Sequence, residues 1–126
     1  MGESIKHFRD LRVYNQAFET APIIFSATKT FPKEEKYAIV DQMRRSSRSI
    51  CANLAELWRK RRYKAAFISK LSDCEAEACE MQVWLEFAFR SGYSEAAFYQ
   101  KYDKAYQQIL AQLVKMSRQP EKWTIG

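Results

Sequence analysis

Seven residues between positions 67 and 88 recur at alternating steps of four and three, and this spacing constrains the fold more than any other feature of the chain. The residues are Phe67, Leu71, Cys74, Ala78, Met81, Leu85 and Ala88. Side chains at these steps lie along one side of an α-helix. The sequence therefore predicts a long amphipathic helix at about residues 63–90, with Gly92 just past its end, where a left-handed residue is common.

Two further segments before this helix show the same periodicity. The first, at about residues 8–29, passes through Pro22, where we expect a kink near Phe18 and no helix end, because the apolar pattern keeps its phase. Its apolar side is predicted to contain Leu11, Tyr14, Phe18, Ala21, Phe25 and Thr28. The second, at about residues 32–59, is expected to begin at Pro32, with acids in its first turn. Its inward side is predicted to contain Ile39, Met43, Ser46, Ile50, Asn53 and Leu57.

A fourth helix is predicted at about residues 94–118, with Ser94 as its N-cap and Pro120 beyond its end. Its apolar side is predicted to contain Phe98, Tyr102, Ala105, Ile109, Leu113 and Met116. Only three Gly and three Pro occur in 126 residues, so the connections between helices are short and neighbours run antiparallel. The predicted fold is all-α, a single domain over residues 1–126 that forms an antiparallel up-down-up-down four-helix bundle.

Neither a membrane span nor a secretory signal is predicted. No apolar run approaches the roughly 18 residues that crossing a bilayer requires, and the N-terminus is polar and charged. The three cysteines, at positions 51, 74 and 79, lie inside helical patterns and are interpreted as small buried hydrophobes in a reducing compartment. We therefore expect a cytoplasmic protein.

Positive charge is concentrated in one part of the chain, although the net charge is only +6. Between Arg44 and Lys70 there are nine Lys or Arg and a single acid, whereas residues 73–86 hold five acids and no base. Clustered cations neutralise phosphates, and Tyr63 within the cluster is able to stack on a base. The candidate nucleic-acid-binding residues are Arg44, Arg45, Arg48, Arg59, Lys60, Arg61, Arg62 and Lys64. The alternative is that these cations only solubilise one end of the bundle.

Three other groups of side chains have structural interpretations. Asn53 is expected to point inward and to bond Ser46, Ser49 or another helix, and Glu56 to pair with Arg45 or Arg48. Four aromatic residues beside the predicted seams are candidates for a subunit interface, and the alternative is that they widen the core face: Trp58, Phe89, Tyr99 and Tyr106. The acids of residues 73–86 are either a solvated helix face or partners for the cations of another subunit.

No catalytic, metal-binding or cofactor-binding constellation is recognised. The only histidine is His7, in the N-terminal segment, so the Glu-x-x-His motifs of a di-iron bundle are missing. Cys74 and Cys79 are five residues apart, which places them on different helix faces, and no further ligand completes a zinc site. We expect no enzyme activity, no metal and no cofactor.

Several motifs resemble one bacterial protein family. They are Phe8-x-x-Leu11-x-Val13-Tyr14, Phe31-Pro32-Lys33-Glu34-Glu35-x-Tyr37, the block from Gln42 to Glu56, and Trp84-Leu85-x-Phe87-Ala88 followed by Gly92-Tyr93. Together they are similar to the four-helix bundle family named after the protein encoded in 23S rRNA intervening sequences. The accessory protein of diversity-generating retroelements is similar to that family too. The resemblance implies a homopentamer whose basic surfaces contact RNA or DNA, and no enzyme activity.

Two functions are consistent with these observations. The first is a non-enzymatic homo-oligomeric bundle that binds RNA or DNA phosphates through its basic residues. The second is a protein–protein interaction scaffold, in which aromatic and acidic faces hold a partner and the basic run only solubilises. A steep loss of affinity with rising salt is expected for the first and not for the second.

Overall fold

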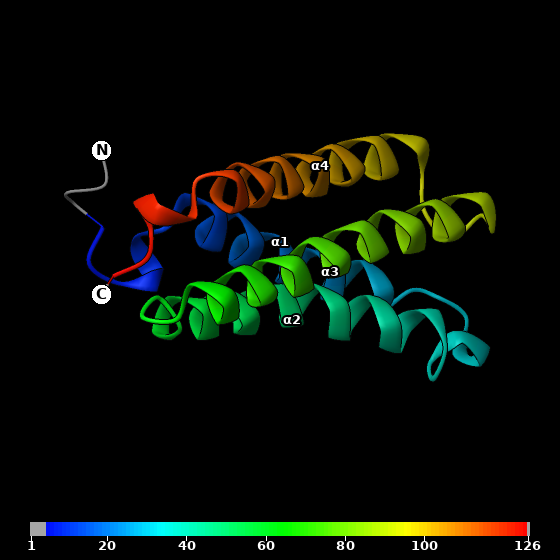
Figure 1. The fold of residues 1–126 in the computed structure, drawn as a ribbon. Helices are drawn as coiled ribbons and strands as arrows, with labels where there is room; N and C mark the ends of the chain where they lie inside the picture. Colours follow the sequence, from blue (N-terminus) through cyan, green and yellow to red (C-terminus); the bar gives the residue numbers. More distant parts are fainter. Residues whose placement is uncertain (1–4, 126) are drawn as a thin grey trace.

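Four long helices run side by side in the computed structural model of this chain, which describes residues 5–125 (Figure 1). They are α1 (Arg12–Thr28), α2 (Ile39–Arg59), α3 (Lys64–Arg90) and α4 (Ala96–Arg118). Three short 3₁₀ turns accompany them, η2 (Phe8–Asp10), η3 (Lys33–Glu35) and η4 (Pro120–Lys122). The α2–α3 turn lies at the same end of the bundle as η2 and η4 (Figure 1). The described part of the chain contains no strand, and the predicted all-α four-helix bundle is confirmed.

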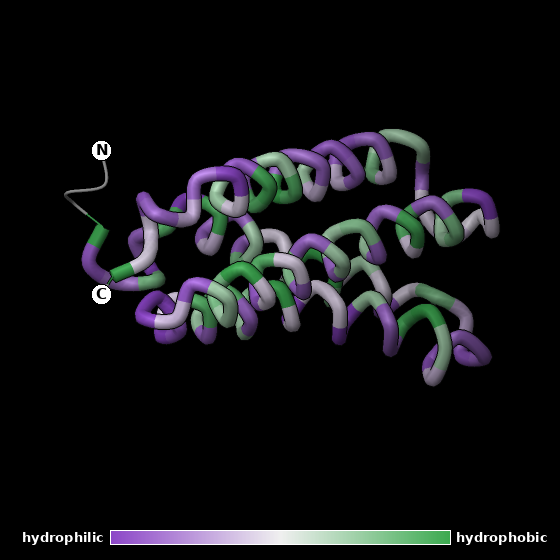
Figure 2. Tube along the Cα trace, in the orientation of Figure 1, coloured by the Kyte–Doolittle hydropathy of each residue, from purple (hydrophilic) through white to green (hydrophobic). Residues whose placement is uncertain are grey.

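The predicted apolar side of α3 is confirmed at every position. The buried residues of α3 are Phe67, Leu71, Cys74, Ala78, Met81, Leu85 and Ala88. They join buried residues of the other three helices in one hydrophobic core, with Ile50 of α2 and Tyr106 of α4 fully buried. Figure 2 shows hydrophobic and hydrophilic residues alternating along each helix, as burial of one helix face requires. No described helix has the length and apolar character needed to cross a membrane.

The end of α3 is capped as predicted. Gly92 has a φ of 81°, and its N–H donates to the carbonyl of Phe89 at 3.0 Å. The N–H of Tyr93 donates to the carbonyl of Ala88 at 2.8 Å, which satisfies a second free carbonyl at the helix end. The predicted start of α4 at about residue 94 is wrong by two residues, because the helix begins at Ala96. Its N-cap is Glu95 and not Ser94, and the buried Ser94 hydroxyl has no hydrogen-bond partner among residues 5–125.

The predicted start of α2 at Pro32 is also wrong. Pro32 is instead the N-cap of the η3 turn, and α2 starts at Ile39. The Tyr93 hydroxyl donates to the Glu35 carboxylate at 2.7 Å, and the Phe31 and Tyr93 rings lie 5.2 Å apart. These contacts hold the connection between α1 and α2 against the α3–α4 loop. Its conformation is therefore set by tertiary contacts and not by the helix propensity of its residues.

The predicted inward side of the first helix is confirmed at Leu11, Tyr14, Ala21 and Thr28, which are buried, and is wrong at Phe18 and Phe25. Phe18 is 56% exposed, whereas its neighbour Ala17 is fully buried. Phe25 is half-buried, and Ile24 takes the core position. Ala17 and Ile24 occupy the contact with the neighbouring helices, so the Phe18 and Phe25 rings lie beside it. The Tyr14 ring is buried in the core. The helix is continuous through Pro22, as expected.

Candidate nucleic-acid interface

The segment Arg59–Lys64 forms the turn between α2 and α3, and we call it the basic turn. Helix α2 ends at Arg59, and the N–H of Lys60 still donates to the carbonyls of Glu56 and Leu57. Tyr63 has an extended backbone and precedes the first residue of α3, Lys64. The turn lies at one end of the bundle (Figure 1), and Arg59, Lys60 and Arg62 within it are exposed there.

Most of the side chains in the basic turn are available to a ligand. Arg59, Lys60 and Arg62 are exposed, and no carboxylate of residues 5–125 lies within ion-pair distance of them. Lys64 pairs with Glu121 only at 3.9 Å, with both side chains exposed, so this contact contributes little. Tyr63 is 63% exposed and lies among them. The turn therefore combines solvated cations with an accessible aromatic ring.

Arg61 is the exception within the turn. Its guanidinium carbon lies 3.7 Å from the centroid of the Trp58 ring, and its Nε donates to the Trp58 carbonyl at 2.8 Å. Partial burial, and secondarily the neighbouring charge of Arg59, lower the pKa of Arg61. The carbonyl of Arg61 also accepts a hydrogen bond from the Ile125 N–H at 2.9 Å. Arg61 thus shapes the turn and holds the C-terminal segment against it.

The other three predicted cations lie elsewhere on α2. Arg44 precedes Arg59 by 15 residues, which is about 22 Å along a helix. Its guanidinium lies 4.1 Å from the centroid of the Phe25 ring and its Nε donates to the Thr28 hydroxyl at 2.9 Å. Arg48 also lies over Phe25, at 5.1 Å, and Arg45 donates to Gln42 at 3.0 Å. The predicted residues therefore do not form one patch. Arg44 and Arg48 form an arginine cluster against α1, Arg45 bonds Gln42 of its own helix, and the other five belong to the basic turn.

Asn53 and Glu56 belong to a polar network between α2 and α3. Asn53 is half-buried and Glu56 is exposed, so the prediction that Asn53 points into the core is wrong, and Leu54 is fully buried instead. Asn53 donates to the Ser49 hydroxyl at 3.2 Å, as one of the predicted alternatives had it. Lys70 donates to Asn53 at 3.3 Å and contacts Glu56 at 2.7 Å.

Lys70 thus takes the place predicted for Arg45 or Arg48 as the partner of Glu56. The hydrogen bond to Glu56 is the main cause that raises the pKa of Lys70. Lys70 is on α3, whereas Glu56, Arg45 and Arg48 are on α2. The pairing of Lys70 with Glu56 therefore depends on how α2 and α3 pack, and residue spacing along α2 alone does not predict it.

The four aromatic residues predicted at an interface divide into two pairs. Tyr106 is fully buried and Trp58 is 6% exposed, so both belong to the core and the prediction is wrong for them. Phe89 and Tyr99 are half-buried, and their rings stack at 5.1 Å between α3 and α4. The prominent exposed aromatic rings of the helices are instead Phe18 and Phe87, each 56% exposed.

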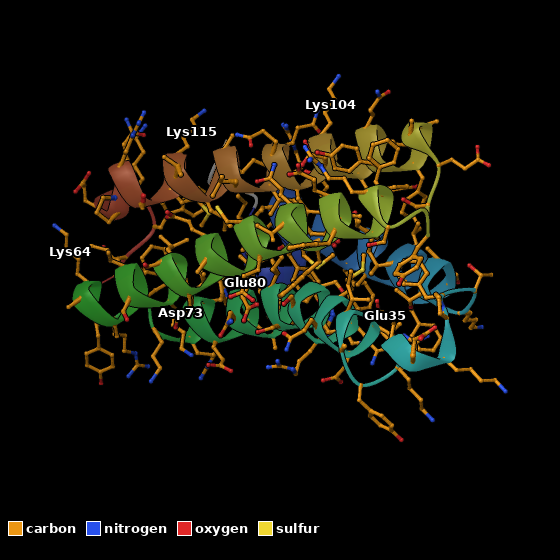
Figure 3. The ribbon with its side chains drawn as sticks, turned by 90° about the vertical axis from the view of Figure 1, so that its right-hand side faces the viewer. Glu35, Lys64, Asp73, Glu80, Lys104 and Lys115 are labelled. Carbon is orange, nitrogen blue, oxygen red and sulfur yellow. The ribbon has the colours of Figure 1, made fainter. Side chains whose placement is uncertain are left out.

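The acids of α3 lie apart from the basic turn. Figure 3 shows Asp73 and Glu80 along α3, away from Lys64 at its start. Glu77 accepts a hydrogen bond from Ser49 at 3.1 Å, and Glu86 pairs with Arg90 at 2.9 Å. The acids of α3 therefore do not neutralise the basic turn within the described chain.

The cysteines and the remaining acids give no metal centre in the described chain. No group of three or more His, Cys, Asp or Glu residues is placed to hold a metal ion among residues 5–125. Burial raises the pKa of Cys51 to about 11 and that of Cys74 to about 12, so both thiols stay protonated at neutral pH. Cys51 is half-buried and Cys79 is exposed, so the prediction that all three cysteines are buried is confirmed only for Cys74.

Comparison with known proteins places this bundle in a family. Residues 9–115 match the family of 23S rRNA-intervening sequence proteins. The chain belongs to that family. The 23S rRNA-intervening sequence family match includes the arginine cluster and the whole basic turn, whereas η4 lies beyond it.

A solved relative confirms the fold of this member of the 23S rRNA-intervening sequence family. It is a crystal structure of a protein with unknown function from the S23 ribosomal protein family of Bacteroides thetaiotaomicron VPI-5482. It is 28% identical, covers 84% of this chain and 95% of its own, and superimposes with a TM-score of 0.74. No curated protein matches the sequence.

Proposed function

We propose that this member of the 23S rRNA-intervening sequence family is a non-enzymatic, homo-oligomeric bundle that binds RNA or DNA phosphates through the basic turn. The single observation that carries the proposal is that Arg59, Lys60 and Arg62 are exposed with no ion-pair partner among residues 5–125. Cations in this state release the counterions of a phosphate backbone when they bind, which drives association at low salt.

The chemistry of the turn favours binding with little sequence preference. Lysine and arginine contacts to phosphates carry no base information. Tyr63 is 63% exposed and adds a ring on which any unpaired base stacks. An unpaired strand presents its bases to such a ring, whereas a duplex hides them, so we expect single strands to bind more tightly than duplexes.

Assembly would strengthen weak binding by each copy. The family resemblance implies a homopentamer, and a ring of copies presents several basic turns to one nucleic acid, which raises the effective concentration of each contact. We also propose that the protein acts in the cytoplasm, where nucleic acid is abundant.

A protein-binding scaffold is the second candidate, and one observation favours it. Phe87 is 56% exposed and Val83 is 47% exposed on α3, and the buried Trp84 Nε1 beside them has no hydrogen-bond partner among residues 5–125. Exposed apolar side chains gathered on one helix are typical of a surface that another chain covers. The same face also suits contact between copies of this chain.

The test compares two variants that lose equal charge at opposite ends of the bundle. In the first, Arg59, Lys60 and Arg62 are all replaced by Ala; in the control, Lys29, Lys33 and Lys36 beside the α1–α2 connection are replaced by Ala. Binding of a labelled single-stranded RNA of about 20 nucleotides is followed by fluorescence anisotropy. We expect a large loss of affinity for the first variant and a small one for the control. Equal losses would show that only net charge matters, and the proposal would fail.

A further inference from the structure

A groove lies between the start of α1 and the end of α4, next to the C-terminal segment. It has a volume of about 490 Å³. Its floor contains the buried side chains of Leu11 and Met116, and the half-buried Trp123 forms one side. Small-molecule sites commonly have volumes of about 300–1,000 Å³ with a mostly apolar lining, so the groove is large enough for one nucleotide.

The charges around the groove are all of one sign. Arg12, Lys115 and Lys122 line it and are exposed, and no Asp or Glu is among the lining residues. None of the three has an ion-pair partner in the part of the chain that the structure describes. An apolar floor with three cations at its edge suits a ligand that is both planar and anionic.

A neutral polar group in the groove adds hydrogen-bonding capacity. Gln112 lines it, and the Gln112 Nε2 donates to the Gln16 Oε1 at 2.7 Å and to the Gln108 carbonyl at 3.2 Å. These contacts orient the Gln112 side chain between α1 and α4. Its Oε1 accepts no hydrogen bond from residues 5–125, so it is free to accept one from an exocyclic amino group.

The groove is connected to the basic turn. Trp123, which forms one side of the groove, belongs to the segment that follows α4. The same segment contacts the basic turn through an ion pair between Glu121 and Lys64 at 3.9 Å. It also contacts the turn through a hydrogen bond that the Ile125 N–H donates to the Arg61 carbonyl at 2.9 Å. A strand held by the basic turn therefore passes close to the groove. Trp123 and Lys122 also lie outside the residues that match the family, so this feature belongs to this chain's own C-terminal segment.

We infer that this groove binds one nucleotide, with the base against Trp123 and Met116 and the phosphate at Arg12, Lys115 and Lys122. The inference rests on the proposed function where the nucleotide is a unit of a single strand held by the basic turn. The shared chemistry is an aromatic base joined to a phosphate, and a free mononucleotide also has it. The experiment below separates these two sources.

The decisive variants are charge reversals at two lysines of α4. Lys115 and Lys104 are 11 residues apart, which is about 16 Å along one side of a helix, and both project away from the bundle (Figure 3). Only Lys115 lines the groove, so Lys104→Glu is the matched control for Lys115→Glu. Trp123→Ala and Trp123→Phe test the stacking surface, and circular dichroism checks that each variant keeps its helices.

Two ligands are titrated into each variant: adenosine monophosphate by calorimetry and labelled single-stranded RNA by anisotropy. We expect Lys115→Glu to weaken both by about tenfold or more, since it removes one charge-assisted contact, whereas Lys104→Glu changes either by less than about twofold. Trp123→Ala should weaken both roughly 5- to 100-fold, and Trp123→Phe should restore most of the loss. Equal effects at Lys104 and Lys115 would overturn the inference.

The remaining outcomes separate the groove from the basic turn. RNA binding that depends on Arg59, Lys60 and Arg62 but not on Lys115 or Trp123 overturns the groove and leaves the proposed function standing. Binding of adenosine monophosphate without any binding of RNA overturns the proposed function and makes the groove a mononucleotide site. If neither ligand binds, both proposals are wrong.

Discussion

The guanidinium of Arg61 stacks on the Trp58 ring at 3.7 Å and donates to the Trp58 carbonyl at 2.8 Å. Trp58 is buried, so its contacts with Arg61 anchor the Arg61 side chain to the core. The Arg61 carbonyl in turn holds Ile125. One cation of the basic turn therefore stabilises the turn, and the exposed Arg59 and Arg62 on either side are free for a ligand.

This division of roles predicts different effects of two similar substitutions. Arg61→Ala removes the stacking contact and a hydrogen bond to a carbonyl, so we expect it to lower the free energy of unfolding by about 1–2 kcal/mol. Arg62→Ala removes an exposed side chain and should change it by less than about 0.5 kcal/mol. Urea denaturation followed by circular dichroism measures both. Equal effects would contradict a structural role for Arg61.

Two phenylalanines test the placement of the core. Phe67 is fully buried, and Phe67→Ala should lower the free energy of unfolding by about 3–5 kcal/mol through lost burial and a cavity. Phe18 is 56% exposed, and Phe18→Ala should cost less than about 1 kcal/mol. The same denaturation experiment gives both values. A large loss at Phe18 would mean that another copy of the chain covers this ring.

The same two residues show how far the sequence predicts the fold. On α3 the large apolar residues and the small ones, such as Phe67 and Ala78, follow one heptad pattern, so spacing alone identifies the buried face. On α1 the contact uses Ala17 and Ile24 while Phe18 and Phe25 lie beside it. Both choices satisfy the periodicity, and only the packing of α1 against its neighbours decides between them.

The sequence predicts the part of the candidate site that is one continuous segment. It does not predict the part that is built from segments far apart in the chain. The basic turn is a run of charge in the sequence between two helical patterns, so its position follows from the helix ends. The groove joins Arg12 to residues more than 100 positions later, and no local pattern reports that proximity. The same limit explains why Lys70 was missed as the partner of Glu56.

Alkaline pH should destabilise the bundle through Cys74. Burial, and then the nearby Asp73, raise its pKa from 9.0 to about 12. Between these values the unfolded chain loses a proton that the folded chain keeps, so the free energy of unfolding falls as pH rises, by up to about 1.4 kcal/mol per pH unit.

Urea titrations across the Cys74 window, from pH 9.0 to about pH 12, check this expectation. The control is Cys74→Ala, which removes the titrating group and should make the decline shallower than in the parent chain. Parallel declines in the two proteins would show that Cys74 does not contribute, and that other buried groups, such as the Tyr106 hydroxyl with its raised pKa, account for the effect.

The salt dependence of RNA binding tests the central claim most directly, because it counts the phosphates that the basic turn neutralises. For single strands the logarithm of the binding constant falls with the logarithm of salt concentration by about 0.7 per phosphate contacted. Replacing Arg59, Lys60 and Arg62 by Ala should therefore reduce the steepness of that line by about 2. A line of unchanged steepness in this variant, or binding that does not depend on salt at all, would contradict the account.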